Sequence, residues 1–181
     1  MPRNHGPWTI KERVQKYKNP WMEVREDRVI RPDGRPGIFG TVRIKAGISV
    51  VPLDENGFVY LTSEFKYAVG RDEIEAVSGG IDNNEKPLSA AKRELKEELG
   101  IQAKEWVNLG LVNPFTSMVH SPAHLFLAKK LRFKKYDQEG TEKIKILKIE
   151  FDKAAKMVFE SKITHGPSCV LILKAKEYLK K

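Results

Sequence analysis

Seven glycine and charged residues between positions 79 and 100 have the types and spacing of a site for metal-assisted chemistry. Five residues separate Gly79 from Glu85, and seven more lead to the run Arg93-Glu94-Leu95-Lys96-Glu97-Glu98-Leu99-Gly100-Ile101. On a helix, Glu94 and Glu98 lie one turn apart on the same face, and Glu97 lies beside them. Clustered carboxylate oxygens suit Mg2+ or Mn2+, which are also bound by waters and substrate phosphates. The spacing therefore indicates a divalent-metal site for a phosphate-bearing substrate.

An ordinary solvated helix is the alternative interpretation of a segment so rich in Glu. In that case Arg93 pairs with Glu97, and Lys92 or Lys96 offsets the remaining negative charge. Like charges one turn apart destabilise an isolated helix by a few tenths of a kcal/mol per pair, so both interpretations need positive charge nearby. Gly79 and Glu85 favour the metal site, because the whole pattern arises by chance only on the order of once in a billion starting positions.

The residues around this pattern predict the elements that position it. Pro87 suits a first helical turn and Gly100 suits a helix end, so a helix is expected over residues 87–99. Leu88, Ala91, Leu95 and Leu99 recur at helical spacing and form an apolar stripe that packs on a core. Residues 78–84, which are rich in Gly and Asn, are expected to form a loop before the helix.

Runs of Val, Ile and aromatic residues between turn residues predict strands in the rest of the chain. They comprise residues 21–30 and 38–45 as an N-terminal hairpin, 47–53 and 58–62 as a second hairpin, and 73–77, 106–112, 124–133 and 144–151. Two further helices are expected at 152–159 and 167–179. This order predicts an α+β fold, an α/β/α sandwich with a mixed sheet. An N-terminal hairpin arm at 1–46 precedes the main domain at 47–181.

Composition excludes several classes of protein. The chain has 181 residues, 40% of them apolar, which is enough for one domain with a real core. No apolar run approaches the ~18 to 20 residues that cross a bilayer. The lone Cys169 cannot form an intramolecular disulfide and no apolar signal region is present, so a cytoplasmic protein without membrane partners is expected. The net charge of +9 suggests an anionic partner such as a nucleotide, RNA or a lipid surface.

The pattern from Gly79 to Ile101 resembles the signature box of the Nudix hydrolases, with every defining position filled. In that family this loop, helix and loop hold divalent metals that help water cleave a diphosphate joining a nucleoside to another group. The resemblance implies that Glu94, Glu98 and the backbone carbonyl of Ser78 bind Mg2+, or alternatively Mn2+. It implies that Glu97 is a further ligand or the general base, that Arg93 orients the glutamates, and that Glu85 braces the loop.

A weaker resemblance extends over nearly the whole chain to the ADP-ribose and nucleoside diphosphate sugar pyrophosphatases. It rests on the N-terminal hairpin, Glu64-Phe65-Lys66-Tyr67, Glu75, and His124-Leu125-Phe126-Leu127-Ala128. In that subgroup the N-terminal strands exchange between subunits and aromatic residues stack on the base. A homodimer and a small nucleotide substrate are thereby implied. Phe39, Trp21 and Trp8 become candidates for stacking, with core or dimer packing as the alternative, and Arg43 and Lys66 become candidates for diphosphate contacts.

Three features depart from the pattern of that subgroup. Residues 113–122 lack the usual Pro-Gly pair and glutamate, Ala76-Val77-Ser78-Gly79 stands where Pro-Ala-Gly is usual, and Lys66 replaces a common arginine. The general base is therefore assigned to Glu97. Glu139 or Glu142 comes second, and His120 is interpreted as a surface histidine.

The expected function is Mg2+-dependent hydrolysis of ADP-ribose or a related nucleoside diphosphate sugar to a nucleoside monophosphate and a sugar phosphate. One alternative is removal of pyrophosphate from RNA 5′ ends, which the positive charge would favour. The other alternative is a non-catalytic nucleotide-sensing module, which would not need the complete set of carboxylates. Nucleic acid is not the expected partner.

Overall fold

A computed structural model describes residues 2–134 and 144–180, and the chain divides into two compact units. The first comprises Met1–Lys45 and Asn113–Pro122, and the second comprises Ala46–Val112 and Ala123–Lys181. Residues 113–122, which the sequence placed within the segment 47–181, thus group with the N-terminal residues.

The first unit is a five-stranded sheet in the order β1-β2-β3-β4-β10. Its strands are β1 (Arg3–His5), β2 (Trp8–Lys18), β3 (Met22–Ile30), β4 (Pro36–Ile44) and β10 (Val119–His120). The strands pair antiparallel except β10, which runs parallel to β4. The hairpin expected from the sequence is β3 and β4. Strands β1 and β2 were not predicted, because β2 is rich in charge and buries only Ile10 below a tenth of its surface.

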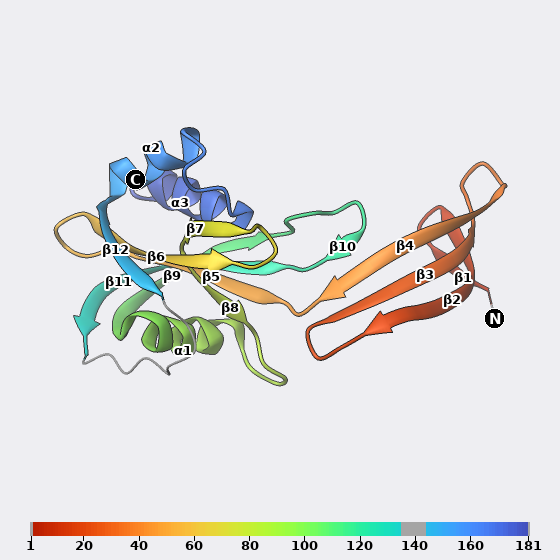
Figure 1. The fold of residues 1–181 in the computed structure, drawn as a ribbon, viewed down its shortest axis with the longest axis horizontal. Helices are drawn as coiled ribbons and strands as arrows, with labels where there is room; N and C mark the ends of the chain where they lie inside the picture. The colour runs from red at the N-terminus through yellow and green to blue at the C-terminus, as the bar shows by residue number, and fades with distance from the viewer. Residues whose placement is uncertain (1, 135–143, 181) are drawn as a thin grey trace. The chain divides into compact units, whose positions relative to one another are not determined.

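Among its described residues, the second unit holds two sheets and three helices. Figure 1 shows their arrangement. The four-stranded sheet runs β8-β5-β11-β9 and the three-stranded sheet β12-β6-β7. The bounds are β5 (Gly47–Pro52), β6 (Phe58–Lys66), β7 (Arg71–Glu75), β8 (Val77–Gly80), α1 (Pro87–Leu99), β9 (Ile101–Val112), β11 (Ala123–Phe133), β12 (Lys145–Glu150), α2 (Phe151–Phe159) and α3 (Gly166–Tyr178). Because β11 is parallel to β5 and antiparallel to β9, the four-stranded sheet is mixed.

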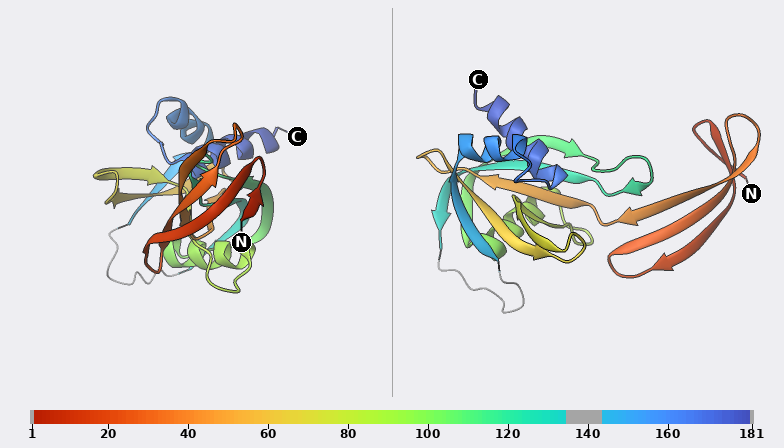
Figure 2. Two further views of the ribbon diagram at one scale, coloured as in Figure 1. Left: turned by 90° about the vertical axis from the view of Figure 1, so that its right-hand side faces the viewer. Right: turned by 45° about the horizontal axis from the view of Figure 1, so that its top comes forward.

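Helices cover both faces of the second unit's sheets (Figures 1 and 2). Ile48 and Val50 of β5 belong to the core cluster that contains the buried face of α1. Val51 of the same strand belongs to the other cluster, with buried residues of α2 and α3. A strand buried on both faces needs apolar residues at successive positions, which explains the near-continuous apolar run of β5. The α+β sandwich with a mixed sheet is confirmed.

Helix α1 has the bounds that the sequence predicts, from Pro87 to Leu99. Gly100 adopts the left-handed conformation (φ 63°), and its N–H bonds to carbonyls of the last turn. The apolar stripe differs by one residue from the expected one. Leu88 is 37% exposed, and Ala90 is buried beside Ala91, Leu95 and Leu99 instead.

The second predicted hairpin is wrong, although both of its strands exist. Asp54 closes the expected turn, since its backbone N–H donates to the carbonyl of Phe58. Beyond one bridge between Leu53 and Val59, however, β5 pairs with β8 and β11, whereas β6 pairs with β7 and β12. Turn chemistry acts over four residues, but the partners of a strand are decided by distant segments.

The strand expected at 73–77 is two strands that separate at Ala76. Strand β7 belongs to the three-stranded sheet and β8 to the four-stranded sheet. Part of the expected loop at 78–84 is therefore strand, because β8 continues to Gly80. Across the described residues, none of the helices has the length and apolar character that crossing a membrane requires.

Candidate active site

Helix α1 and the loop before it place four charged side chains together at one edge of the second unit. Ala90, Ala91, Leu95 and Leu99 pack into the core. Arg93, Glu94 and Glu97 lie beside this buried face, and Glu85 approaches them from the loop. The structure therefore brings Glu85, Glu94 and Glu97 together around Arg93.

Arg93 joins this cluster through five hydrogen bonds. It donates through Nε and Nη2 to both carboxylate oxygens of Glu85, each at 3.1 Å. Nη1 donates to Glu94 at 2.8 Å and to Glu97 at 3.1 Å, and Nη2 also donates to the carbonyl of Gly80 at 3.0 Å. The hydrogen bond to Glu85 is the main reason that the pKa of Arg93 is raised and that the pKa of Glu85 is lowered. One guanidinium therefore ties the loop to the helix.

The Glu94 carboxylate lies directly against Gly79. A Cβ built at Gly79 would overlap the Cδ and Oε1 atoms of Glu94, so only glycine leaves room for this carboxylate. Burial raises the pKa of Glu94 above its ordinary value, against the opposing effect of Arg93. Burial disfavours the charged form of this carboxylate, and a nearby cation would favour it.

The donor set fits a hard divalent cation that keeps waters of its own. In the described parts of the chain, no three His, Cys, Asp or Glu side chains form a ready metal cage. Mg2+ does not need one, because it is usually held by one or two carboxylates with waters and substrate phosphates. Glu94, whose carboxylate occupies the recess beside Gly79, would supply the first ligand. All other candidate donor atoms are also oxygens.

The remaining candidate ligands lie around this recess on α1 and β8. Glu97 is more than half exposed and bonds to Arg93. Glu98 follows Glu94 by one turn, and its charge acts on Lys66. Ser78 lies on β8 opposite Ser49 of β5, and its hydroxyl donates to the carbonyl of Ala76 at 2.9 Å.

Lys66, a predicted phosphate contact, also lies in the second unit, at the end of β6. Its ammonium is 2.7 Å from Glu64 and 3.7 Å from Glu75. Burial lowers the pKa of Lys66, but the hydrogen bond to Glu64 and the charges of Glu75, Glu64 and Glu98 raise it above the ordinary value. The side chain is therefore a firmly charged cation.

The other predicted substrate contacts lie in the first unit and are not gathered at one place. Phe39 of β4 lines a cavity of about 610 Å3, whereas Trp21 and Arg43 do not. Trp21 follows β2 in a turn and is 71% exposed. Arg43 faces Glu23 across the pairing of β3 and β4.

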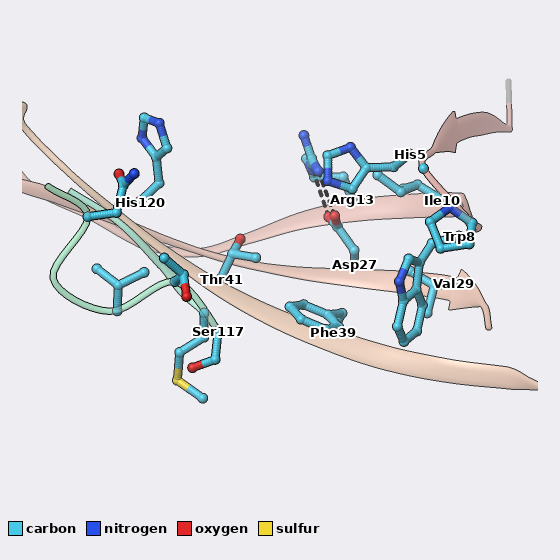
Figure 3. Close-up of a pocket in the computed structure, with 16 residues that line it drawn as sticks. His5, Trp8, Ile10, Arg13, Asp27, Val29, Phe39, Thr41, Ser117 and His120 are labelled. Atoms are coloured by element: carbon cyan, nitrogen blue, oxygen red, sulfur yellow. Dashed lines mark hydrogen bonds and ion pairs between the residues drawn. The ribbon is translucent and has the colours of Figure 1, made fainter. Parts of the chain in front are cut away.

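The cavity of the first unit combines apolar rings with an ion pair in which only the carboxylate of Asp27 is buried (Figure 3). Trp8 meets Phe39 edge to face, with ring centroids 5.4 Å apart. Arg13 binds both oxygens of Asp27 at 2.7 and 2.6 Å, and this hydrogen bonding lowers the pKa of Asp27. His120 lines the same cavity. No sequence motif marks Arg13 and Asp27, because their pairing joins residues 14 positions apart on two strands.

The second-choice bases, Glu139 and Glu142, lie outside the described residues.

Two family models match successive parts of the chain. The family model for the NUDIX domain matches residues 43–153, and that for the nucleoside diphosphate sugar hydrolase N-terminal domain matches residues 8–42. An ADP-ribose pyrophosphatase of Bacillus subtilis (strain 168) is 23% identical over 70% of this chain and 70% of its own length. An ADP-ribose pyrophosphatase of Mycobacterium tuberculosis (strain ATCC 25618 / H37Rv) is 29% identical over 60% of this chain and 53% of its own length.

A solved structure supports the fold. The crystal structure of an ADP compounds hydrolase superposes with a TM-score of 0.84 at 18% identity. The match covers 98% of this chain and 97% of that chain.

Proposed function

The chain belongs to the Nudix family and is a pyrophosphohydrolase, and from this premise we propose that its substrate is ADP-ribose or a related nucleoside diphosphate sugar. The match of residues 8–42 to the N-terminal domain of nucleoside diphosphate sugar hydrolases supports this substrate class, as do relatives named ADP-ribose pyrophosphatase. The products would be a nucleoside monophosphate and a sugar phosphate. The match of residues 8–42 carries the substrate class, and the Glu94 carboxylate, which is held against Gly79 and bonded to Arg93, carries the proposed metal site.

Glu94, Glu98, Glu97 and the carbonyl of Ser78 are the groups proposed to hold Mg2+. When bound, the ion would neutralise the diphosphate and lower the pKa of a water molecule. Arg93 keeps the carboxylates of Glu94 and Glu97 in position, and Glu85 keeps Arg93 in position. The oxygen of the attacking water becomes bonded to one phosphorus, and the bond from that phosphorus to the bridging oxygen breaks. Glu97, which is accessible to solvent, is proposed to accept the proton of the water.

Substrate contacts are proposed for Lys66, Phe39, Arg43 and Trp21. The charged ammonium of Lys66 suits a phosphate oxygen. Phe39 lines the cavity of the first unit together with Trp8, and such rings suit the flat face of a nucleobase. Trp21 and Arg43 are exposed at the surface of the first unit, where a ligand or a second copy of the chain would reach them.

We also propose a homodimer formed through residues 1–46. Large apolar side chains of the first unit are exposed, among them Trp21 at 71%, Ile38 at 67% and Tyr17 at 53%. These side chains would be covered in a dimer that joins the first units of two chains. Light scattering coupled to size-exclusion chromatography should give twice the mass of the 20.7 kDa chain. A monomer at micromolar concentration would contradict the proposal.

The decisive experiment replaces the proposed ligand and the proposed base with glutamine, which keeps shape but removes charge. Glu98→Gln and Glu97→Gln should each lower kcat for ADP-ribose with Mg2+ by about 100-fold or more. Glu105→Gln is the matched control, because Glu105 is an ion-paired surface glutamate on β9. The thermal midpoint of each variant shows whether it is folded. Full activity in both site variants would contradict the assignment.

The substrate is identified by a panel assayed with Mg2+ and with Mn2+. The panel contains ADP-ribose, other nucleoside diphosphate sugars, dinucleotides, and RNA with a 5′-triphosphate. The highest kcat/KM should belong to a nucleoside diphosphate sugar. A higher value for RNA would favour the pyrophosphohydrolase that acts on RNA ends.

A further inference from the structure

Ala76 is the point at which the chain passes from one sheet of the second unit to the other. It separates β7, which pairs with β6, from β8, which pairs with β5. The residue is fully buried. A buried backbone N–H or carbonyl that lacks a partner is costly, so a residue leaving one ladder for another needs partners from elsewhere.

Two serines supply those partners. The N–H of Ala76 donates to Oγ of Ser168 at 2.9 Å, across 92 positions of sequence. The carbonyl of Ala76 accepts from the hydroxyl of Ser78 at 2.9 Å. Ser78 and Gly79 follow Ala76 by two and three positions. Ser78 carries the proposed carbonyl ligand, and Gly79 leaves the space that the Glu94 carboxylate occupies.

Ser168 is itself held in one orientation. Its side chain is fully buried in the first turn of α3, and its Oγ is 2.8 Å from Nδ1 of His165. Burial is the main cause that lowers the pKa of His165, which favours the neutral imidazole. A neutral ring with its proton on Nε2 accepts the hydroxyl proton of Ser168, and the oxygen lone pairs remain for the N–H of Ala76. Glu75 lies 3.6 Å from the same Nδ1 atom.

We infer that Ser168 is a positioning residue for the proposed metal site, which it reaches through Ala76 and strand β8. The inference rests on the proposed function, because it takes Ser78 and Glu94 as metal ligands. Ser168 does not touch the proposed ligands. It anchors the start of β8 to α3, so the carbonyl of Ser78 is placed by a helix as well as by its pairing with β5.

The test measures metal binding directly. Mn2+ is titrated into the full chain without substrate, and free Mn2+ is followed by electron paramagnetic resonance. Ser168→Ala removes the acceptor for the N–H of Ala76. It should raise the Kd for Mn2+ by about tenfold, the lower end of the effect of losing a group that orients a ligand. The Mg2+ concentration for half-maximal hydrolysis of ADP-ribose should rise by a similar factor, while KM at saturating Mg2+ stays unchanged.

Cys169→Ala is the matched control. Cys169 lies next to Ser168 on α3, but its thiol donates to the carbonyl of Ile163 and not to the β7–β8 junction. This variant should keep the Kd for Mn2+ within twofold of the unaltered chain. An equal rise in both variants would overturn the inference, since it would mean that any loss of packing around α3 weakens the site.

Thermal midpoints establish that each variant is folded at the assay temperature. Should Ser168→Ala not fold, Ser168→Cys keeps a similar volume with a weaker acceptor, and it should raise the Kd by a smaller factor. An unchanged Kd in whichever variant folds would overturn the inference. Failure of the unaltered chain to bind Mn2+ would instead overturn the proposed function, so the two failures are distinguishable.

Discussion

Gly79 and Glu94 illustrate how much of the site depends on a single small residue. The carboxylate of Glu94 occupies the space in which a side chain at position 79 would lie. A carboxylate placed there loses solvent, and burial raises its pKa. Glycine is therefore needed at position 79 because it leaves room for the charged carboxylate of Glu94.

Gly79→Ala should weaken metal binding by displacing the carboxylate of Glu94. The added methyl group overlaps Cδ and Oε1 of Glu94, so the side chain must leave its recess. We expect the Kd for Mn2+ to rise about tenfold or more, measured by the same titration.

Gly40→Ala is the control for that substitution. A Cβ at Gly40 meets no atom within 4 Å, and its backbone is not in the left-handed region. It should leave the Kd unchanged. A Gly79→Ala variant with unaltered Mn2+ affinity would show that the recess is not the metal site.

The residues of the Arg93 cluster can be recognised in the sequence, whereas those that support the cluster from a distance cannot. Glu85, Arg93, Glu94 and Glu97 lie within 13 positions of one another, so their spacing is visible in the chain. Ser168 meets Ala76 across 92 positions, and no local pattern records such a contact. The stretch from His165 to Ser168 accordingly suggests only the start of a helix.

At the scale of elements, local chemistry predicts α1 well and strand pairing poorly. Pro87, the apolar spacing and Gly100 all lie within the helix or at its ends, and they gave its bounds. The pairing of β5 with β11 joins residues about 75 positions apart, such as Val50 and Phe126. Loop closure over that distance depends on the whole core, and the sequence of β5 does not encode its partner.

Gly100→Ala should lower the free energy of unfolding by about 1–2 kcal/mol, because a residue with a Cβ is strained in the left-handed conformation that Gly100 adopts. Gly100→Asn should cost less, since asparagine tolerates this region better. Urea denaturation of the two variants measures the difference. Equal losses would indicate that the conformation of this cap is not what stabilises the end of α1.

His165, the residue that precedes α3, should make the stability of the fold depend on pH. The pKa of His165 is lowered in the folded chain, chiefly by burial and also by Lys66, although Glu75 and Glu73 raise it. The unfolded chain, with the ordinary value of 6.5, therefore binds more protons as the pH falls below 7. The free energy of unfolding should decrease as pH is lowered through this window, by at most about 1.4 kcal/mol per pH unit from this group.

His165→Asn removes this titration and keeps a polar side chain beside Ser168. The decrease in unfolding free energy between pH 7 and pH 5.5 should be smaller in the variant, as urea denaturation at each pH would measure. A variant with the same or a steeper decrease would contradict the assignment to His165.

At the scale of the whole molecule, the net charge of +9 bears on the choice between a small nucleotide and RNA. A substrate with two phosphates is attracted by nearby cations and screened by salt. A long polyanion also releases condensed counterions, which makes its binding fall steeply as salt rises.

For ADP-ribose, KM should rise by no more than about threefold between roughly 50 and 200 mM NaCl, since only screening acts. Initial rates at several salt concentrations, with Mg2+ held constant, give this dependence. A rise in KM of about 1,000-fold over the same range of salt would indicate a polyanionic substrate and would favour RNA ends.

The ten residues Asn113–Pro122 complete a sheet whose other strands all come from the first 45 positions. A chimera that transfers this sheet intact into a relative would therefore need three fusion points. A chimera that transfers only the first 45 residues would lack the edge strand β10. Deletion of the N-terminal residues would likewise remove Val42 and Arg43, the strand partners of Val119 and His120. Insertions and deletions in the two stretches should consequently accumulate together over evolution, as matched changes in one folded piece.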